Sequence, residues 1–176
     1  GDIAEDFVQF YREEGGLFTE EDFANFNPIW DDPIHINYRG YDIYSSPPTS
    51  RGGLEVLMQL KLVERFDLRA LGLGNPLLTH LLAEAIQVAK SDIYQYVADP
   101  KKFSVPTEGM LEESYLSLRS DLISEANSMV YPAAGEPRGY DRSSSGSRNS
   151  RRGLILGSDR ERSHEGSTTS FSIMDR

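Results

Sequence analysis

The period of hydrophobic and polar residues changes several times along this chain, and each change predicts a different element. Over four long stretches apolar residues recur every three or four positions, which is the spacing of one face of an α-helix. These stretches are 2–14, 50–68, 75–97 and 109–123. The second is apolar around most of its circumference, so we expect that helix to lie in the interior. In the fourth, the predicted apolar face consists of Leu111, Tyr115, Leu118 and Leu122.

Residue types that are favoured at helix termini mark the ends of these helices. A glycine pair follows the first stretch and can adopt the left-handed conformation that closes many helices. Asn75 and Pro76 are the types favoured at the N-cap and the first position of the third helix. A further short helix is predicted in "FTEEDFANF", because Thr19 precedes Asp22 by three residues, the spacing of a capping pair.

Between residues 33 and 46 the hydrophobic period becomes two. Ile34, Ile36 and Tyr38 alternate with polar residues, and the alternation resumes after Arg39 and Gly40. This pattern predicts a β-hairpin with its turn at Arg39 and Gly40. The two prolines that follow lack the amide hydrogen that a strand ladder needs, so they end the second strand.

The C-terminal quarter combines a polar segment with a short strand-like run. Ser, Gly, Arg and Pro dominate residues 132–167, which bury too little apolar surface to offset the entropy of ordering, and we predict a flexible linker there. The run "TTSFSIMD" alternates: Phe171 and Ile173 fall on one face of a strand, and Thr168 starts the hydroxyl-bearing face. Such a strand needs a partner sheet, so we expect further chain beyond Arg176.

Composition and charge exclude several classes of site and partner. The 176 residues are enough for one domain with a core, and the absence of cysteine excludes disulfides and thiolate metal sites. Residues 1–135 carry 10 basic and 22 acidic side chains, and this acidic body argues against nucleic acid or an anionic membrane as a partner. No stretch approaches the roughly 18 apolar residues of a membrane span. The first residues have the pattern of an amphipathic helix, so we expect the sequence to begin inside a longer protein.

Six short motifs occur in the same order as in one enzyme family. They are "FYREEGGLFTEEDFANF", "YRGYDIYSSPPTSRGG", "LVERFDL", the stretch from His80 to Pro100, "FSVP" and "TTSFSIMD". Together they resemble the gamma-glutamyltranspeptidases (gamma-glutamyltransferases), over residues 5–125 and 167–175. The resemblance implies an N-terminal nucleophile (Ntn) hydrolase that cuts its own precursor into a large and a small subunit. It predicts an α+β fold, the mainly helical portion of an αββα sandwich, incomplete in this chain.

The resemblance also divides the chain and assigns the chemistry. It implies that residues 1–131 are the C-terminal portion of the large subunit, that 132–167 lead to the cut, and that 168–176 open the small subunit. The family pattern places the nucleophile at Thr168 and the cut between Ser167 and Thr168. A threonine hydroxyl needs a base, and the α-amino group that the cut exposes is suited to this role near neutral pH.

The same resemblance implies the substrates and partners. The full-length protein is expected to transfer a γ-glutamyl group from glutathione or a related compound to water, an amino acid or a peptide. We expect no cofactor and no metal. The segment alone is expected to be inactive, because the family's other substrate-binding residues and the remainder of both subunits lie outside it. The family favours a periplasmic, extracellular or membrane-associated location.

Two residues depart from the family pattern. Ser170 stands at the usual histidine position, and Ile93 stands where the family commonly has arginine after an aspartate. These departures indicate a divergent member, and Ser170 bears on acceptor preference and on the rate of self-cleavage. Two alternatives stay open: a related Ntn acylase acting on β-lactam side chains or other amides, and a non-catalytic scaffold in which Thr168 is only a strand residue.

Other polar residues have structural interpretations. We expect His35 to be exposed on its strand, His80 to be packed or capping, and His164 to lie in the linker without metal ligands. Glu84 and Asp92 lie roughly 12 Å apart along one helix, too far for a glycosidase pair. The glycines of "SRGGLEV" favour close backbone packing over phosphate binding, because no lysine follows in P-loop spacing.

Overall fold

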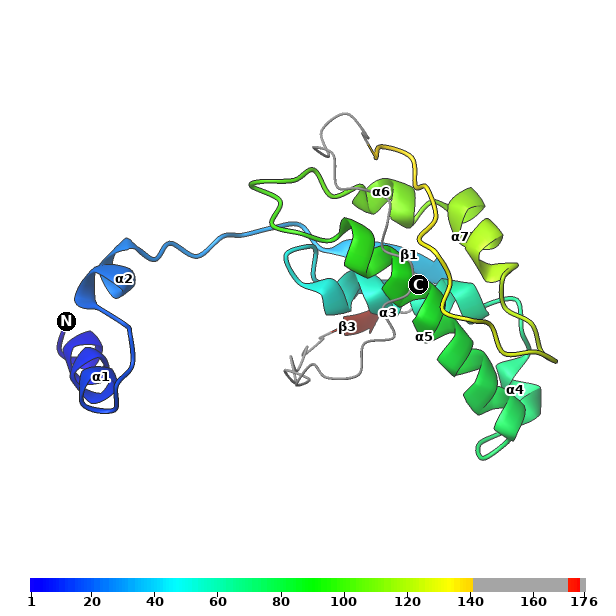
Figure 1. The fold of residues 1–176 in the computed structure, drawn as a ribbon, viewed down its shortest axis with the longest axis horizontal. Helices are drawn as coiled ribbons and strands as arrows, with labels where there is room; N and C mark the ends of the chain where they lie inside the picture. Colours follow the sequence, from blue (N-terminus) through cyan, green and yellow to red (C-terminus); the bar gives the residue numbers. More distant parts are fainter. Residues whose placement is uncertain (141–170, 175–176) are drawn as a thin grey trace. The chain divides into compact units, whose positions relative to one another are not determined.

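The computed structural model describes residues 1–140 and the backbone of residues 171–174 (Figure 1). The chain divides into two compact units, Gly1–Asp31 and Asp32–Arg176. The first unit contains helix α1 (Asp2–Glu13) and helix α2 (Glu20–Asn25). The predicted capping pair is confirmed, because the Thr19 hydroxyl accepts from the Asp22 amide and the Asp22 carboxylate accepts from the Thr19 amide. The glycine after α1, Gly15, has the predicted left-handed conformation, with φ of 77°.

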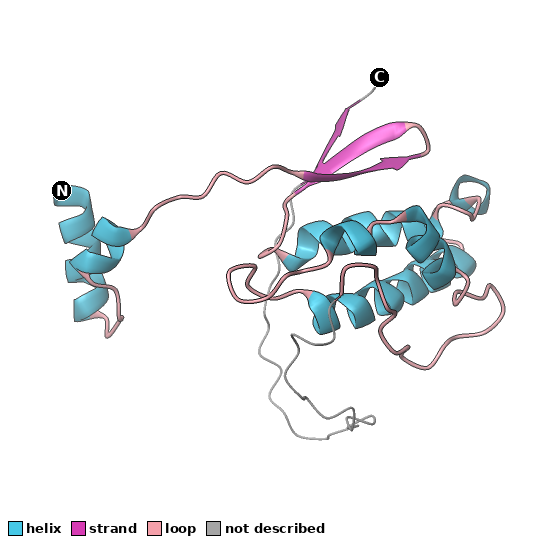
Figure 2. Cartoon of the chain, turned by 90° about the horizontal axis from the view of Figure 1, so that it is seen from above, coloured by secondary structure: helices cyan, strands magenta, loops and turns pink. Residues whose placement is uncertain are grey.

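The second unit contains the predicted hairpin and a third strand. Strands β1 (Ile34–Tyr38) and β2 (Tyr41–Ser45) pair antiparallel across a turn at Arg39 and Gly40. Strand β3 (Phe171–Met174) pairs antiparallel with the other edge of β2, so the strand order is β1-β2-β3. The strands form one layer, and the helices of this unit lie to one side of it (Figure 2).

The helices of the second unit follow the hydrophobic periods with some breaks. They are α3 (Arg51–Val63), α4 (Leu68–Leu71), α5 (Pro76–Tyr96), α6 (Thr107–Met110) and α7 (Glu113–Ser120). Asn75 caps α5 as predicted, its side chain accepting from the Leu77 amide at 2.9 Å. At the end of α3 the Arg39 guanidinium donates to the carbonyls of Glu64 and Phe66.

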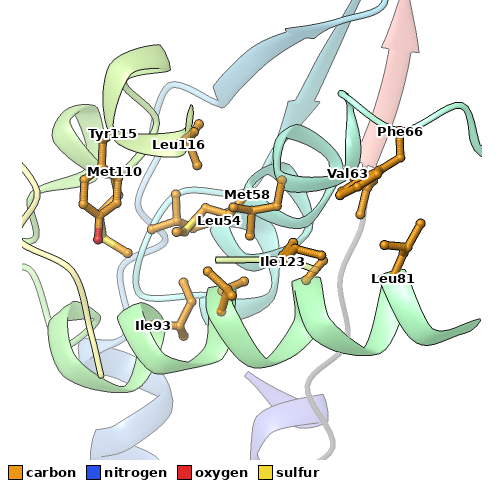
Figure 3. Packing of buried hydrophobic residues seen from close by; sticks show 14 of the residues in the cluster. Leu54, Met58, Val63, Phe66, Leu81, Ile93, Met110, Tyr115, Leu116 and Ile123 are labelled. Carbon is orange, nitrogen blue, oxygen red and sulfur yellow. The ribbon is translucent and has the colours of Figure 1, made fainter. Parts of the chain in front are cut away.

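The core lies between α3, α5 and α7. Leu54 and Met58 of α3 meet Leu81 and Ile93 of α5, and the same cluster includes Leu116 of α7 (Figure 3). A smaller cluster of Ile36, Ile43 and Leu57 joins the hairpin to α3. The predicted interior position of the 50–68 helix is thereby confirmed for α3, whose apolar residues serve both clusters.

The helix predicted over 109–123 is confirmed only for α7, because the structure has two helices, α6 and α7, in this region. Glu112 has extended backbone angles, φ −64° and ψ 131°, and separates α6 from α7. Leu118 and Leu122 are 69% and 45% exposed, while Leu116 and Arg119 are buried. Of the predicted apolar face, Tyr115 is buried and Leu111 is partly buried against the core. The burial of Arg119 depends on a charged partner in α5, which the hydrophobic pattern does not register.

A close approach of two backbones joins β2 to the start of α3. A Cβ atom placed on Gly53 would lie 2.1 Å from the carbonyl oxygen of Ser46 and 2.7 Å from the Ser46 hydroxyl. Only a residue without a side chain fits here, which confirms the packing interpretation of the "SRGGLEV" glycines for Gly53.

Candidate functional site

The predicted nucleophile Thr168 and its neighbour Ser167 lie outside the described residues, as does His164. The structure does describe the strand that follows them, because β3 begins at Phe171 and pairs with β2. The register places Phe171 opposite Ser45, at the end of β2 from which the chain continues toward α3. Three peptide units join Thr168 to Phe171, so their Cα atoms can lie at most about 11 Å apart.

The register of β3 also assigns its positions to the two faces of the sheet. Opposite positions in an antiparallel ladder share a face. Ile173 is opposite Ile43, which is opposite Ile36, and these last two are buried against Leu57 of α3. The position before Ile173 is opposite Tyr44, on the other face. The apolar positions of β3 therefore align with the face that α3 covers.

The surroundings of His35 and His80 agree with the structural roles predicted for them. His35 is exposed on β1 and stacks on Tyr44, with 5.2 Å between ring centroids. His80 is half-buried at the start of α5, and its Nε2 lies 2.7 Å from the carbonyl oxygen of Ser124. Within the described part of the chain, no group of three or more histidines, aspartates or glutamates is placed to hold a metal ion.

A surface hollow of about 210 Å³ lies between α3 and α7. Its charged side chains pair with one another: Lys61 contacts Glu64 and Glu113, and Arg65 lies 3.5 Å from Asp121. Because these cations already have carboxylate partners, the hollow does not present an open anion site. The helices of the described residues include none with the length and apolar character to cross a membrane.

A buried charged cluster between α5 and α7 was missed by sequence reasoning. Asp92 has no exposed surface and Arg119 is 7% exposed. The Nε of Arg119 donates to Asp92 Oδ2 at 3.0 Å, and its Nη2 lies 2.9 Å from Oδ1. Tyr115 donates its hydroxyl to Oδ2 at 2.9 Å, and Ser91 accepts from Arg119 Nη2 at 2.8 Å. Each carboxylate oxygen has donors, the condition under which a buried charge is tolerated.

The backbone of an extended segment closes this cluster. We call residues 132–140 the strap. The amide of Gly135 donates to Asp92 Oδ1 at 2.8 Å, and the carbonyl of Ala133 accepts from Arg119 at 3.1 Å. The hydroxyl of Tyr96 donates to the Gly135 carbonyl. These are the first residues of the range predicted as a linker, and here they lie against the helices.

Two glycines let the strap approach the helices closely. A Cβ on Gly109 would lie 1.9 Å from the carbonyl oxygen of Arg138, and one on Gly135 would lie 2.5 Å from the Tyr115 hydroxyl. Further along, Arg138 pairs with Glu112 at 3.0 Å, and the Tyr140 ring contacts that of Tyr96 at 4.8 Å between centroids. The strap is thus held by backbone hydrogen bonds, an ion pair and a ring contact.

The charges and hydrogen bonds of this cluster indicate a role in stabilising the fold. Burial and the neighbouring Asp92 carboxylate raise the pKa of Tyr115 far above its ordinary value, so its hydroxyl stays protonated and keeps donating. Every group found in the cluster is engaged with another, which leaves it suited to fixing α5, α7 and the strap together. The signal in the sequence was a polar pair, Ser91 and Asp92, among the apolar residues of α5, whose buried face also includes Glu84.

Comparison with known proteins finds relatives along the whole chain. The family model described as "Gamma-glutamyltranspeptidase" matches residues 1–176. The "Glutathione hydrolase proenzyme" of Escherichia coli (strain K12) is 36% identical over 123 residues, 70% of this chain and 21% of that protein. The protein of the same name in Bacillus subtilis (strain 168) is 32% identical over 176 residues, 100% of this chain and 29% of that protein. The "Acylase ACY 1 proenzyme" of Pseudomonas sp. (strain SE83) is 33% identical over 123 residues, 70% of this chain and 22% of that protein.

Solved structures of the same kinds of protein are similar to this chain in fold and in sequence. The gamma-glutamyltranspeptidase of Helicobacter pylori superposes with a TM-score of 0.65 and 34% identity, covering 73% of this chain and 37% of that chain. The cephalosporin acylase from Bacillus halodurans superposes with a TM-score of 0.58 and 33% identity, covering 70% of this chain and 23% of that chain.

These likenesses and the mixed fold define the mainly helical portion of an Ntn-hydrolase αββα sandwich, as the sequence predicted. The chain belongs to the gamma-glutamyltranspeptidase family. It spans less than a third of the length of the E. coli and B. subtilis relatives, 21% and 29%.

Proposed function

We propose that the full-length protein is a gamma-glutamyltransferase or glutathione hydrolase, made as a precursor that cuts itself between Ser167 and Thr168. The observation that carries this proposal is the Thr-Thr pair one residue ahead of β3, in a chain that the family model matches from end to end. The curated relatives are named as proenzymes, which supports a precursor that is processed.

The proposed chemistry uses one hydroxyl twice. In the precursor, the Thr168 hydroxyl attacks the Ser167 carbonyl carbon; the carbon–nitrogen bond breaks, an ester forms, and the Thr168 nitrogen takes up a proton. Water then hydrolyses this ester, which frees the hydroxyl and leaves a carboxylate on Ser167. The new α-amino group accepts the hydroxyl proton when Thr168 attacks a γ-glutamyl amide.

The second attack produces a γ-glutamyl ester on Thr168 and releases the amine of the donor, for example cysteinylglycine from glutathione. Water or the amine of an amino acid or peptide then takes the γ-glutamyl group and restores the hydroxyl. The tetrahedral intermediates need oxyanion donors, each worth about 3 to 4 kcal/mol. We assign those donors and the other substrate contacts to the remainder of the two subunits, so the segment alone should be inactive.

Mass spectrometry of the purified full-length protein tests the cut. We expect two polypeptides, the smaller beginning at Thr168, and a single uncut chain for Thr168→Ala. Thr169→Val is the matched control, because it removes the neighbouring hydroxyl and should still be cut. A Thr168→Ala protein that is cut at the same bond, or a wild-type protein that stays whole and keeps its amidase activity, would overturn the proposal.

A second function has a specific observation in its favour. An acylase proenzyme is 33% identical to this chain over 123 residues, and a cephalosporin acylase shares its fold at 33% identity. Both proposed reactions need the same cut and an ester on Thr168, and they differ only in the acyl group of that ester, so processing does not separate them. Release of p-nitroaniline from a γ-glutamyl anilide, compared with side-chain release from a cephalosporin, separates them: we expect the anilide to be the faster substrate.

A further inference from the structure

We propose that the strap, residues 132–140, is a retention clamp that stays bound to α5 and α7 after the precursor has been cut. This inference rests on the proposed self-cleavage, because a cut between Ser167 and Thr168 would end the covalent connection from the strap to β3. The strap would then hold the new C-terminal part of the large subunit through its own contacts alone.

Among the described residues, the contacts that hold the strap come from the helical core. Gly135 uses both backbone groups: its amide donates to Asp92, and its carbonyl accepts from Tyr96. The Ala133 carbonyl accepts from Arg119. The three partner side chains lie on α5 and α7 and are themselves buried, so their positions are fixed by the core on either side of the cleavage reaction.

Release of the strap would leave buried charges short of partners. Asp92 would lose the Gly135 amide from a carboxylate with no exposed surface, and Arg119 would lose the Ala133 carbonyl. Buried polar atoms that lose a hydrogen bond without gaining water are strongly disfavoured. The strap therefore supplies hydrogen bonds that this buried ion pair needs, and both partners of each bond stay in the large subunit after the cut.

The strap has little influence on how readily the cut bond is reached. Between the strap and β3 lie 30 residues, 141–170. If the strap came away, the next anchor upstream would be the Met129 amide, which donates to Glu84 at 3.0 Å. The connection would then have 41 residues, 130–170, and for a flexible chain the change from 30 to 41 residues makes closure only about 1.6-fold less favourable. A change this small would hardly alter the rate of the cut. These magnitudes therefore support a role for the strap in holding the C-terminal part of the large subunit.

Hydrogen exchange followed by mass spectrometry tests the clamp on the full-length protein. We expect peptides covering 132–140 to exchange at the same rate, within twofold, in the cut wild type and in uncut Thr168→Ala. Tyr96→Phe removes one hydrogen bond to the strap and keeps the ring, so exchange there should become about fivefold faster in both forms. The matched control is Tyr94→Phe, on the same helix at 63% exposure, which should change neither exchange nor cleavage.

The rate of cleavage and the hydrogen exchange of the core show whether the clamp proposal holds. Tyr96→Phe should be cut within twofold of the wild-type rate, with unchanged exchange in α3. A wild-type strap that exchanges tenfold faster once the chain is cut overturns the clamp, and so does a tenfold slower cut in Tyr96→Phe. If the wild type is never cut, the proposed function fails as well; the mass spectrum distinguishes that case from a chain that is cut and releases its strap.

Discussion

Replacing the buried carboxylate of Asp92 should destabilise the protein more than any substitution of an exposed charge. Asp92→Asn keeps the shape of the side chain and removes its charge, which leaves the Arg119 guanidinium buried without a counter-ion. Breaking one partner of a buried ion pair costs about 3 to 5 kcal/mol. A domain is stable by only about 5 to 15 kcal/mol, so this loss is a large share of the total.

Urea unfolding followed by circular dichroism measures this cost. With a denaturant slope of about 2 kcal/mol per M, the unfolding midpoint of Asp92→Asn should fall by about 2 M. The matched control is Asp121→Asn, which removes an exposed carboxylate 3.5 Å from Arg65 and should cost less than about 1 kcal/mol.

A double variant tests the electrostatic reason. Asp92→Leu with Arg119→Met removes both buried charges, and it should be more stable than either single variant, because no uncompensated charge is left. The reasoning is refuted if Asp92→Asn costs no more than Asp121→Asn, or if the double variant is destabilised by the full sum of the single ones.

Two further predictions concern Tyr115 and Gly53. Burial and Asp92 raise the pKa of Tyr115 in the folded state, so the folded form keeps a proton that the unfolded form loses above about pH 10. Stability should therefore be fully present below that pH and fall as the pH rises beyond it; urea unfolding between pH 8 and 11 should show a shallower fall for Tyr115→Phe, and an equal fall would contradict this. Gly53→Ala would place a methyl group 2.1 Å from the Ser46 carbonyl oxygen, and it should lower the free energy of unfolding by about 1 to 3 kcal/mol in the same assay; an unchanged midpoint would show that β2 yields without cost.

The sequence by itself determined the elements whose signals are local. The cap at Thr19, the start of α5 at Asn75 and the turn at Arg39 each depend on residues within a few positions of one another, and all three are present in the structure. The ordered series of motifs also pointed to the family, which the match over residues 1–176 establishes. The assignment of Thr168 as nucleophile rests on that motif pattern and stays a prediction.

Tertiary structure alone decided which polar residues enter the core. Asp92, Arg119 and Gly135 are widely separated in sequence, and their hydrogen bonds form only after α5 and α7 have packed. A hydrophobic period treats aspartate and arginine as exposed, so in the 109–123 stretch it found Leu111 and Tyr115 but missed Arg119, and it left the strap out of the fold. The physical reason is that a charge becomes tolerable in an interior through its partner, and the partner is supplied by a distant part of the chain.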